Sequence, residues 1–446
     1  MDNPSAEAVR SEGETSLSDL NFADGTRPPA RRTRALQTES AQVSNAAGVR
    51  RGPALARGSQ DIFVEIADGR KLAEIQPSWI ALLERSDEPN VFMDPALVRV
   101  AADVYPKTES VALLAWRKDG GRSELVGVWA FAVGSARHSA LPVRILTAPP
   151  FLHGYSATPV IDRDCLDETL DAMLDWIAAD ERLPKIVALD AMATDGPIMK
   201  ALTRVLAARG KAPRILDRSL RPKLKSDLDG KNYLEQALSS STRKKLRQHR
   251  RRLSERGDLS SVIIHDPQAV RDALEHFLQM EASGWKGRQG TALLCSDADA
   301  AFARTAVGAL SEQGRACIHA LTLDRRPVSM QIVLRAGPAA FTWKIAYDET
   351  LHDVSPGMLL LEDYTAAFLN DPAIASVNSC TYDDRSFMSV WTERESIANL
   401  WIDARRGGSV SFELLWRLQK GYCGLRAMVK NAYLKPRRAQ PRKRSA

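Results

Sequence analysis

The sequence contains no long hydrophobic run and no recognisable export signal. No stretch approaches the roughly 18 consecutive apolar residues that a membrane-spanning helix needs. The first residues, MDNPSAEAVRSEGETSL, contain neither the basic nor the apolar segment of a secretory signal. Both absences predict a cytoplasmic protein without a membrane span.

Cysteine is sparse, and the common metal and nucleotide motifs are missing. The five cysteines lie far apart without a C-x-x-C pair, and the seven histidines form no H-x-E or H-E-x-x-H spacing. These absences disfavour structural zinc, metal catalysis and a disulfide framework. The chain also lacks G-x-S-x-G, G-x-x-x-x-G-K-[ST] and G-x-G-x-x-G, which disfavours hydrolase, P-loop and Rossmann chemistry.

Positive charge is concentrated in two segments. The net charge is +7. Residues 241–257 contain eight Lys/Arg and one acid, and residues 426–446 contain eight Lys/Arg and no acid. The remainder of the chain is therefore mildly acidic. A surface that is basic all over, as in a nucleic-acid-coating protein, is not expected.

The length of 446 residues predicts more than one domain. Residues 1–59 show no regular apolar spacing and are expected to be a disordered tail. Two mixed α+β regions follow, at 60–220 and 221–433, and then a basic tail at 434–446. In the second region three strands, ACIHALTLD, PVSMQIVLR and AAFTWKIAYD, follow one another with short turns, which predicts an antiparallel arrangement. Helices are predicted at 230–256 with a break near 239–241, at 267–284, at 297–312 and at 410–432.

The segment TWKIAYDETLHDVSPGMLLLEDY combines a strand, a polar loop and the start of a helix. Backbone N–H groups at a helix N-terminus suit phosphate or pyrophosphate. Gly357 permits close approach of a ligand, and the Ser355 side chain is expected to cap the helix. The alternative is an ordinary capped helix.

Three further features have both a functional and a structural explanation. Arg243 and Arg247 share one face of a basic helix. This face suits a phosphate-bearing ligand, a tRNA acceptor stem or an acidic lipid surface. The alternative is a solvated surface helix without a ligand. Trp285 follows a helix and is either a core anchor or a substrate contact. Asp383, after a strand, is either a general base or part of a loop ion pair.

Five segments, in this order, resemble the GNAT-type acetyltransferase domain of the CelD/BcsL group, which is associated with bacterial cellulose and exopolysaccharide functions. The related FemAB transferases repeat the GNAT-like fold twice. The resemblance therefore implies two tandem GNAT-like domains with mixed, largely antiparallel sheets flanked by helices. The segments are STRKKLRQHRRRLSERG, FLQMEASGWKGRQGTAL, ALTLDRRPVSMQIVL, AYDETLHDVSPGMLLLEDY and DDRSFMSVW.

The resemblance implies transfer of an acetyl or other acyl group from acyl-CoA, without a metal, to an amine or hydroxyl of a small-molecule or saccharide-linked acceptor. Asp383 is then the expected base and Tyr347 the expected acid. The expected cofactor-binding residues are His352, Asp353, Val354, Ser355, Gly357, Met358 and Leu359. The expected acceptor-binding residues are Trp285, Lys344, Arg385, Arg243 and Arg247.

The sequence departs from the family pattern at two places. Of the three fixed positions of the pyrophosphate signature only Gly357 is kept, with Val354 and Leu359 at the others. Met388 stands where relatives often have lysine. Two alternatives therefore stay open: a FemAB-like transferase that uses aminoacyl-tRNA held by helix 239–257, and a non-catalytic binding module on a GNAT fold.

Overall fold

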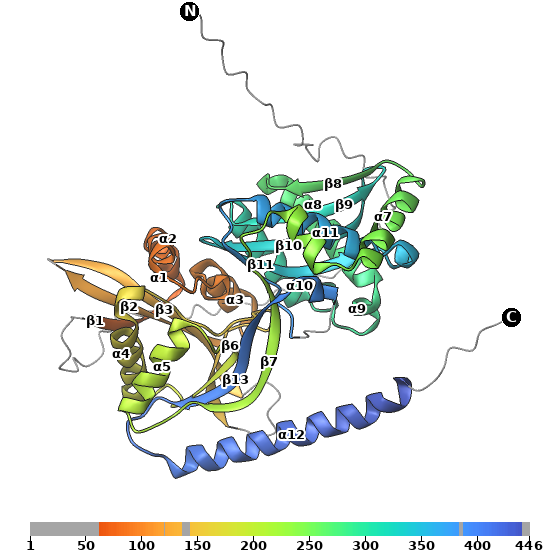
Figure 1. Cartoon of the computed structure of the whole chain (residues 1–446). Coiled ribbons are helices and arrows are strands. Elements are labelled where there is room, and N and C mark those ends of the chain that lie inside the picture. Colours follow the sequence, from red (N-terminus) through yellow and green to blue (C-terminus); the bar gives the residue numbers. More distant parts are fainter. Residues whose placement is uncertain (1–61, 120, 136–142, 383–386, 439–446) are drawn as a thin grey trace, which may run out of the picture.

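One continuous mixed β-sheet runs through both halves of the chain (Figure 1). The computed structural model describes residues 62–119, 121–135, 143–382 and 387–438. The predicted tail 1–59 lies outside the described residues. The strand order is β1-β2-β3-β4-β6-β13-β7-β12-β11-β10-β9-β8, with β5 paired to β3.

The elements of the first half are β1 (Ile62–Ala67), α1 (Gly69–Glu74), α2 (Gln76–Arg85), η2 (Val91–Met93), α3 (Pro95–Val104), β2 (Glu109–Asp119), β3 (Arg122–Ser135), β4 (Arg144–Ala148), β5 (Val160–Ile161), η3 (Arg163–Cys165), α4 (Leu166–Ala179), β6 (Ile186–Ala193), α5 (Pro197–Ala208) and β7 (Arg214–Leu224).

The elements of the second half are α6 (Gly230–Ala237), α7 (Ser240–Ser254), β8 (Leu259–Ile264), α8 (Pro267–Ser283), α9 (Trp285–Arg288), η4 (Leu293–Cys295), α10 (Asp297–Ser311), β9 (Ala316–Leu323), β10 (Arg326–Ala336), β11 (Ala339–Tyr347), η5 (Glu349–Val354), α11 (Pro356–Asn370), β12 (Ser376–Asn378), η6 (Phe387–Val390), β13 (Glu393–Asp403) and α12 (Val410–Arg438).

The two halves repeat one order of elements. In each half an edge strand is followed by helices and then by an antiparallel set of strands; in the second half α6 and α7 precede this series. Each then crosses over through a helix to a parallel strand, β4–α4–β6 in the first half and β11–α11–β12 in the second. The predicted α+β class and the three successive antiparallel strands are confirmed.

Strand β13 joins the halves, although it comes near the end of the chain. It lies between β6 and β7 and is antiparallel to both, with Leu400 opposite Leu189 and Trp401 opposite Arg214. Strand β7 then pairs with β12, where Leu224 lies opposite Val377. The first half therefore completes its sheet with a strand from the second half.

Local signals place the helices well. The predicted break before α7 is confirmed, because Leu238 is extended and Ser239 caps α7 by accepting a hydrogen bond from the Thr242 amide. Leu246 and Leu253 are buried as their spacing predicts. Helix α3 and strands β4 and β8 were not predicted from the sequence. Helix α12 continues to Arg438, so it includes the start of the segment expected as a tail; residues 439–446 lie outside the description.

The two halves also share a hydrophobic core. The rings of Phe92 in η2 and Phe341 in β11 meet edge to face at a centroid distance of 5.5 Å. Asp94 accepts a hydrogen bond of 2.8 Å from Trp79 and forms a buried ion pair with Arg315 of the second half. The halves are therefore packed together as well as joined through the sheet.

We expect replacement of Leu400 by alanine to destabilise the chain by about 3 kcal/mol, because this fully buried side chain leaves a cavity. Since β13 belongs to both halves, urea unfolding followed by tryptophan fluorescence and by circular dichroism should shift as one transition. Two separate transitions, of which only one moves, would contradict a shared sheet.

Candidate active site

The site begins where two parallel strands separate. Strand β11 pairs with β12 only through Ala339–Phe341. Beyond this point β11 continues to Tyr347, while the backbone that follows β12 turns away at Cys380, whose φ is 53°. The pairing of β11 with β10 also shifts register between Ile332 and Val333. This divergence leaves the outer part of β11 facing a hollow instead of a β12 partner.

A cavity of about 310 Å³ fills this divergence, a size within the usual range of ligand pockets. Thr342–Ile345 of β11 form one wall, and Ser379–Thr381 form the other. Trp285 and Phe387 also line the cavity. The structure thus brings together Trp285 and Lys344, two side chains that the sequence suggested for acceptor binding.

A buried ion pair supports one wall. Lys286 donates hydrogen bonds of 2.8 Å to Glu281 and to the Ile345 carbonyl oxygen. Glu281, only 3% exposed, also accepts a hydrogen bond of 2.8 Å from the Leu293 amide. Burial lowers the pKa of Lys286. The pair fixes α8, α9 and β11 relative to one another.

The first half contributes directly to the cavity. Lys344 Nζ lies 3.1 Å from the Tyr155 hydroxyl and 3.3 Å from His153 Nδ1, and both residues come from the connection after β4. Trp343 donates a hydrogen bond of 2.9 Å to the His153 carbonyl oxygen. Burial lowers the pKa of Lys344. Burial, followed by the Lys344 ammonium, lowers the pKa of His153 to about 4.

Arg221 of β7 ties Tyr155 to the wall formed by Ser379–Thr381. Its side chain is fully buried and donates hydrogen bonds of 2.7 Å to the Tyr155 carbonyl oxygen and 2.8 Å to the Thr381 carbonyl oxygen. The guanidinium also lies over the Tyr382 ring, 5.2 Å from its centroid. An arginine with several fixed donors holds backbone segments more rigidly than a lysine can.

The predicted cofactor turn follows β11 directly. Ser355 precedes α11 in the left-handed conformation, with φ 50° and ψ 57°, and its side chain makes no capping hydrogen bond. The expectation that it caps α11 through its hydroxyl was therefore wrong, because this backbone conformation replaces the extended one that side-chain capping uses. Gly357 lies beside Tyr347, since an added Cβ would be 3.5 Å from that ring.

The other turn residues differ in what they can offer a ligand. His352 and Asp353 are exposed, and Asp353 pairs with Arg256. Val354 and Leu359 are fully buried in the second core cluster, so only their backbones can face a ligand. Met358 is half-buried.

Glu349 connects the turn to the cavity wall. It accepts hydrogen bonds of 2.5 Å from the Trp285 amide and 2.6 Å from Arg288. The Arg288 guanidinium and the Trp285 amide hold the pKa of the Glu349 carboxyl below its ordinary value. The turn and the wall that contains Trp285 are thus held together.

Four further predicted residues, Asp383, Arg385, Arg243 and Arg247, are not among the described residues that line the cavity. Asp383 and Arg385 lie outside the described residues. Arg243 and Arg247 are on α7, which supplies none of the residues described as lining the cavity. The same helix directs Arg250 to Glu362 and Asp363 of α11. Met388 is buried and lines the cavity.

His153, Tyr155 and Arg221 were not among the site residues predicted from the sequence. The segment FLHGY, which contains the first two, offered a signal, since aromatic and imidazole groups follow a strand there. Arg221 had no local signal, because its partners are 66 and 160 residues away.

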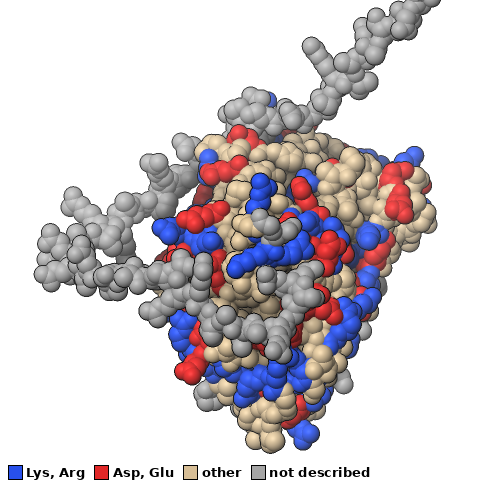
Figure 2. All heavy atoms as spheres, turned by 90° about the vertical axis from the view of Figure 1, so that its left-hand side faces the viewer, with Lys and Arg blue, Asp and Glu red and all other residues tan. Residues whose placement is uncertain are grey.

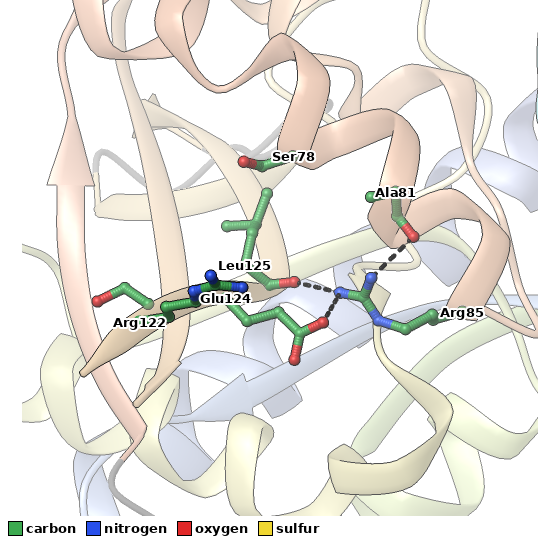
Figure 3. Close-up of a pocket in the computed structure, with 7 residues that line it drawn as sticks. Ser78, Ala81, Arg85, Arg122, Glu124 and Leu125 are labelled. Atoms are coloured by element: carbon green, nitrogen blue, oxygen red, sulfur yellow. Dashed lines mark hydrogen bonds and ion pairs between the residues drawn. The ribbon is translucent and has the colours of Figure 1, made fainter. Parts of the chain in front are cut away.

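A second hollow, of about 360 Å³, lies between α2 and β3 in the first half (Figure 3). Arg85 dominates it and donates to Asp162 at 2.6 Å, to the Leu125 carbonyl at 2.8 Å and to the Ala81 carbonyl at 3.0 Å. It also pairs with Glu124. With its nitrogens held in this way, Arg85 serves packing, and we assign this hollow no ligand.

Charges of both signs mix on the face that the first half presents (Figure 2). Two ion pairs of the first half are Arg204 with Asp167 and Arg163 with Asp87. This agrees with the expectation that the surface is not basic all over.

Comparison with known proteins indicates the type of reaction that the second half catalyses. Residues 240–373 match the model of the acetyltransferase (GNAT) domain. No curated protein matches the sequence. Among solved structures, the chain is similar to FemX, with 11% identity and a TM-score of 0.51, over 73% of this chain and 95% of that chain.

Two other solved structures are similar at lower TM-scores. One is a tandem GNAT protein from the clavulanic acid biosynthesis pathway, at 13% identity and TM-score 0.40, over 78% of this chain and all (100%) of that chain. The other is L-PGS from Bacillus licheniformis, at 14% identity and TM-score 0.43, over 79% of this chain and 97% of that chain.

The domain match and the repeated element order confirm the predicted fold, two tandem GNAT-like halves of α+β class. The chain is an acyltransferase enzyme, with the matched domain in its second half. The finer assignment to the CelD/BcsL group stays a prediction.

We expect His153 to make the fold acid-sensitive. Because its pKa is about 4 in the folded state and about 6.5 when unfolded, the unfolded chain binds the proton first as the pH falls. Its contribution is complete above about pH 6.5 and decreases by about 3 kcal/mol towards pH 4. Urea unfolding across this range should show the loss in the wild type.

The variant His153→Asn keeps a polar side chain but removes the titration. Its unfolding free energy should lose about 3 kcal/mol less than the wild type over the same range. Parallel curves for the two proteins would show that His153 does not titrate in this way.

Proposed function

We propose that the chain transfers an acetyl or other acyl group from acyl-CoA to an amine or hydroxyl of a small-molecule or saccharide-linked acceptor. The observation that carries the proposal is the cavity where β11 and β12 diverge, inside the matched domain and directly before the α11 turn. A cytoplasmic location and a role in exopolysaccharide or cellulose biosynthesis belong to the same proposal.

The residues around the cavity fit an acyl-CoA. Beyond Phe341, β11 has no β12 partner. Apart from the Ile345 carbonyl, which Lys286 holds, its backbone would offer groups to an amide-containing arm, as an open strand edge does for an extended peptide. The start of α11, with Ser355, Gly357 and Met358, offers a positive helix end to a pyrophosphate. His352 and Asp353 border it, and Val354 and Leu359 contribute backbone only.

The bound thioester would supply the activated acyl group. The chain would orient the acceptor between Trp285 and Lys344, and the Phe387 ring at the cavity would help to exclude water. Backbone N–H groups along β11 would stabilise negative charge on the carbonyl oxygen. Asp383 is our proposed base and Tyr347, next to Gly357, our proposed acid for the leaving group.

The acceptor side of the proposal includes positively charged groups. Lys344 lies between the neutral His153 and Tyr155, and burial lowers its pKa. Such a lysine binds an acidic or hydroxyl-rich acceptor and exchanges protons more readily than an exposed one. Arg385 is proposed to add a second cation.

We also propose that the chain divides into a first domain at 60–220 and a second at 221–433. The repeated order of elements on both sides of β7 supports this division. In this arrangement the second domain binds the acyl donor and the first completes the acceptor side.

A second candidate function is aminoacyl transfer from tRNA, in the manner of FemAB proteins. The exposed cations of α7, Lys244, Lys245 and Arg247, favour it, with Arg243 beside them. Arg250 is held by carboxylates of α11, which reduces the charge that the helix offers.

We expect acetyl-CoA and free CoA to raise the melting temperature of the chain, since ligand at 100 times its Kd stabilises by roughly 2.7 kcal/mol. The variant Gly357→Glu should lose this shift, because a carboxylate at the helix start repels pyrophosphate while it suits the helix itself. Gly357→Ala is the matched control, because its Cβ only reaches ordinary contact with Tyr347.

An equal shift in Gly357→Glu and wild type would remove the turn from the proposed site. No shift with either coenzyme, together with a salt-sensitive shift with tRNA, would replace the first candidate by the second.

A further inference from the structure

Helix α12 has an exposed row of large apolar side chains. They recur every three or four residues and so lie on one face of the helix. No other helix or strand of the described chain has more than one exposed large apolar side chain. The row comprises Leu414, Leu418, Tyr422, Leu425, Met428 and Val429, with exposed fractions from 36% to 64%.

A different face of α12 packs on the body. Phe412 is buried against a cluster that contains Trp401 of β13, and Trp416 packs against the same cluster. Arg214 of β7 pairs with Glu413. From there α12 runs along the lower edge of the molecule, and its C-terminal end reaches away from the sheet (Figure 1). The exposed apolar row is therefore separate from the face by which α12 packs on the body.

Positive charge accompanies the row. Arg417, Lys420 and Arg426 are exposed, and in helical projection Arg417 and Arg426 flank the row on its two sides. The only acid of α12 is Glu413, which is paired with Arg214. After Met428 the sequence has seven more Lys/Arg and no acid. The helix is thus apolar on one side and basic around it.

The charge argues for one kind of partner. A second copy of α12 would bring two cationic helices together, which like-charge repulsion opposes. Residues 1–61 contain eight acids and eight bases, so they offer no negative excess. Nucleic acid would match the charge but leave the apolar row in water. An anionic lipid surface offers both negative headgroups and an apolar layer.

We propose that α12 docks the enzyme on anionic lipid bilayers, with the row of Leu414 to Val429 in the outer part of the acyl layer and Arg417 and Arg426 at the headgroups. Among the described helices none is long and apolar enough to cross a membrane, so α12 lies along the surface. This docking is independent of the acyl acceptor.

The test is co-sedimentation of the full chain with two kinds of vesicle: pure phosphatidylcholine, and equal parts of phosphatidylcholine and phosphatidylglycerol. We expect binding to the anionic vesicles alone, weakened by salt. Leu418→Glu should weaken it roughly tenfold or more, and Arg417→Gln and Arg426→Gln by about fivefold each. Ile263→Glu on edge strand β8 is the matched control, because its side chain is similarly exposed, and it should bind as the wild type does.

Circular dichroism and sedimentation velocity on the same variants separate the other outcomes. No binding to anionic vesicles by a folded wild type would overturn the proposal. So would a wild-type dimer that Leu418→Glu converts to a monomer without any vesicle binding, because the row would then serve self-association. Equal loss in the Ile263→Glu control would also overturn it.

Discussion

The pairing of β13 between β6 and β7 is the constraint on which the molecule depends. It places the last described strand in the sheet of the first half and leaves β7 to pair with β12. Two repeated halves therefore share one sheet and a common core. Because the halves are fixed in this way, side chains from both can meet at one cavity.

The cavity exists because β11 and β12 pair over only a short stretch. Strands β11 and β12 pair at three positions and then diverge, so the backbone of β11 and the space beside it become available. The second half supplies the strand edge and the helix start, which suit an acyl donor. The first half supplies Tyr155 to the lining of the cavity. His153 lies against Lys344, and Arg221 of β7 donates to the Tyr155 carbonyl oxygen, so both hold lining residues in place. The ion pair of Glu281 and Lys286 keeps this arrangement rigid.

Local chemistry predicted much of the fold and part of the site. The break before α7, the three successive strands and the helix after Ser355 all depend on nearby residues, so propensity and turn signals located them. The position of β13 depends on partners some 200 residues away, which no local pattern encodes. Trp285 and Lys344 were predicted because they belong to recognisable sequence segments. Arg221 was not predicted because its hydrogen-bond partners are far away in the sequence. The Ser355 hydroxyl was assigned a cap because the sequence does not reveal a left-handed backbone.

Hydrogen–deuterium exchange with and without acetyl-CoA tests most directly whether the second half holds the acyl donor. We predict slower exchange at the backbone amides of Thr342–Tyr347 and at the start of α11, because the donor would cover the strand edge and the helix end. Unchanged exchange there, with protection instead at β4 and the chain that leads to α4, would contradict the account and place the donor in the first half.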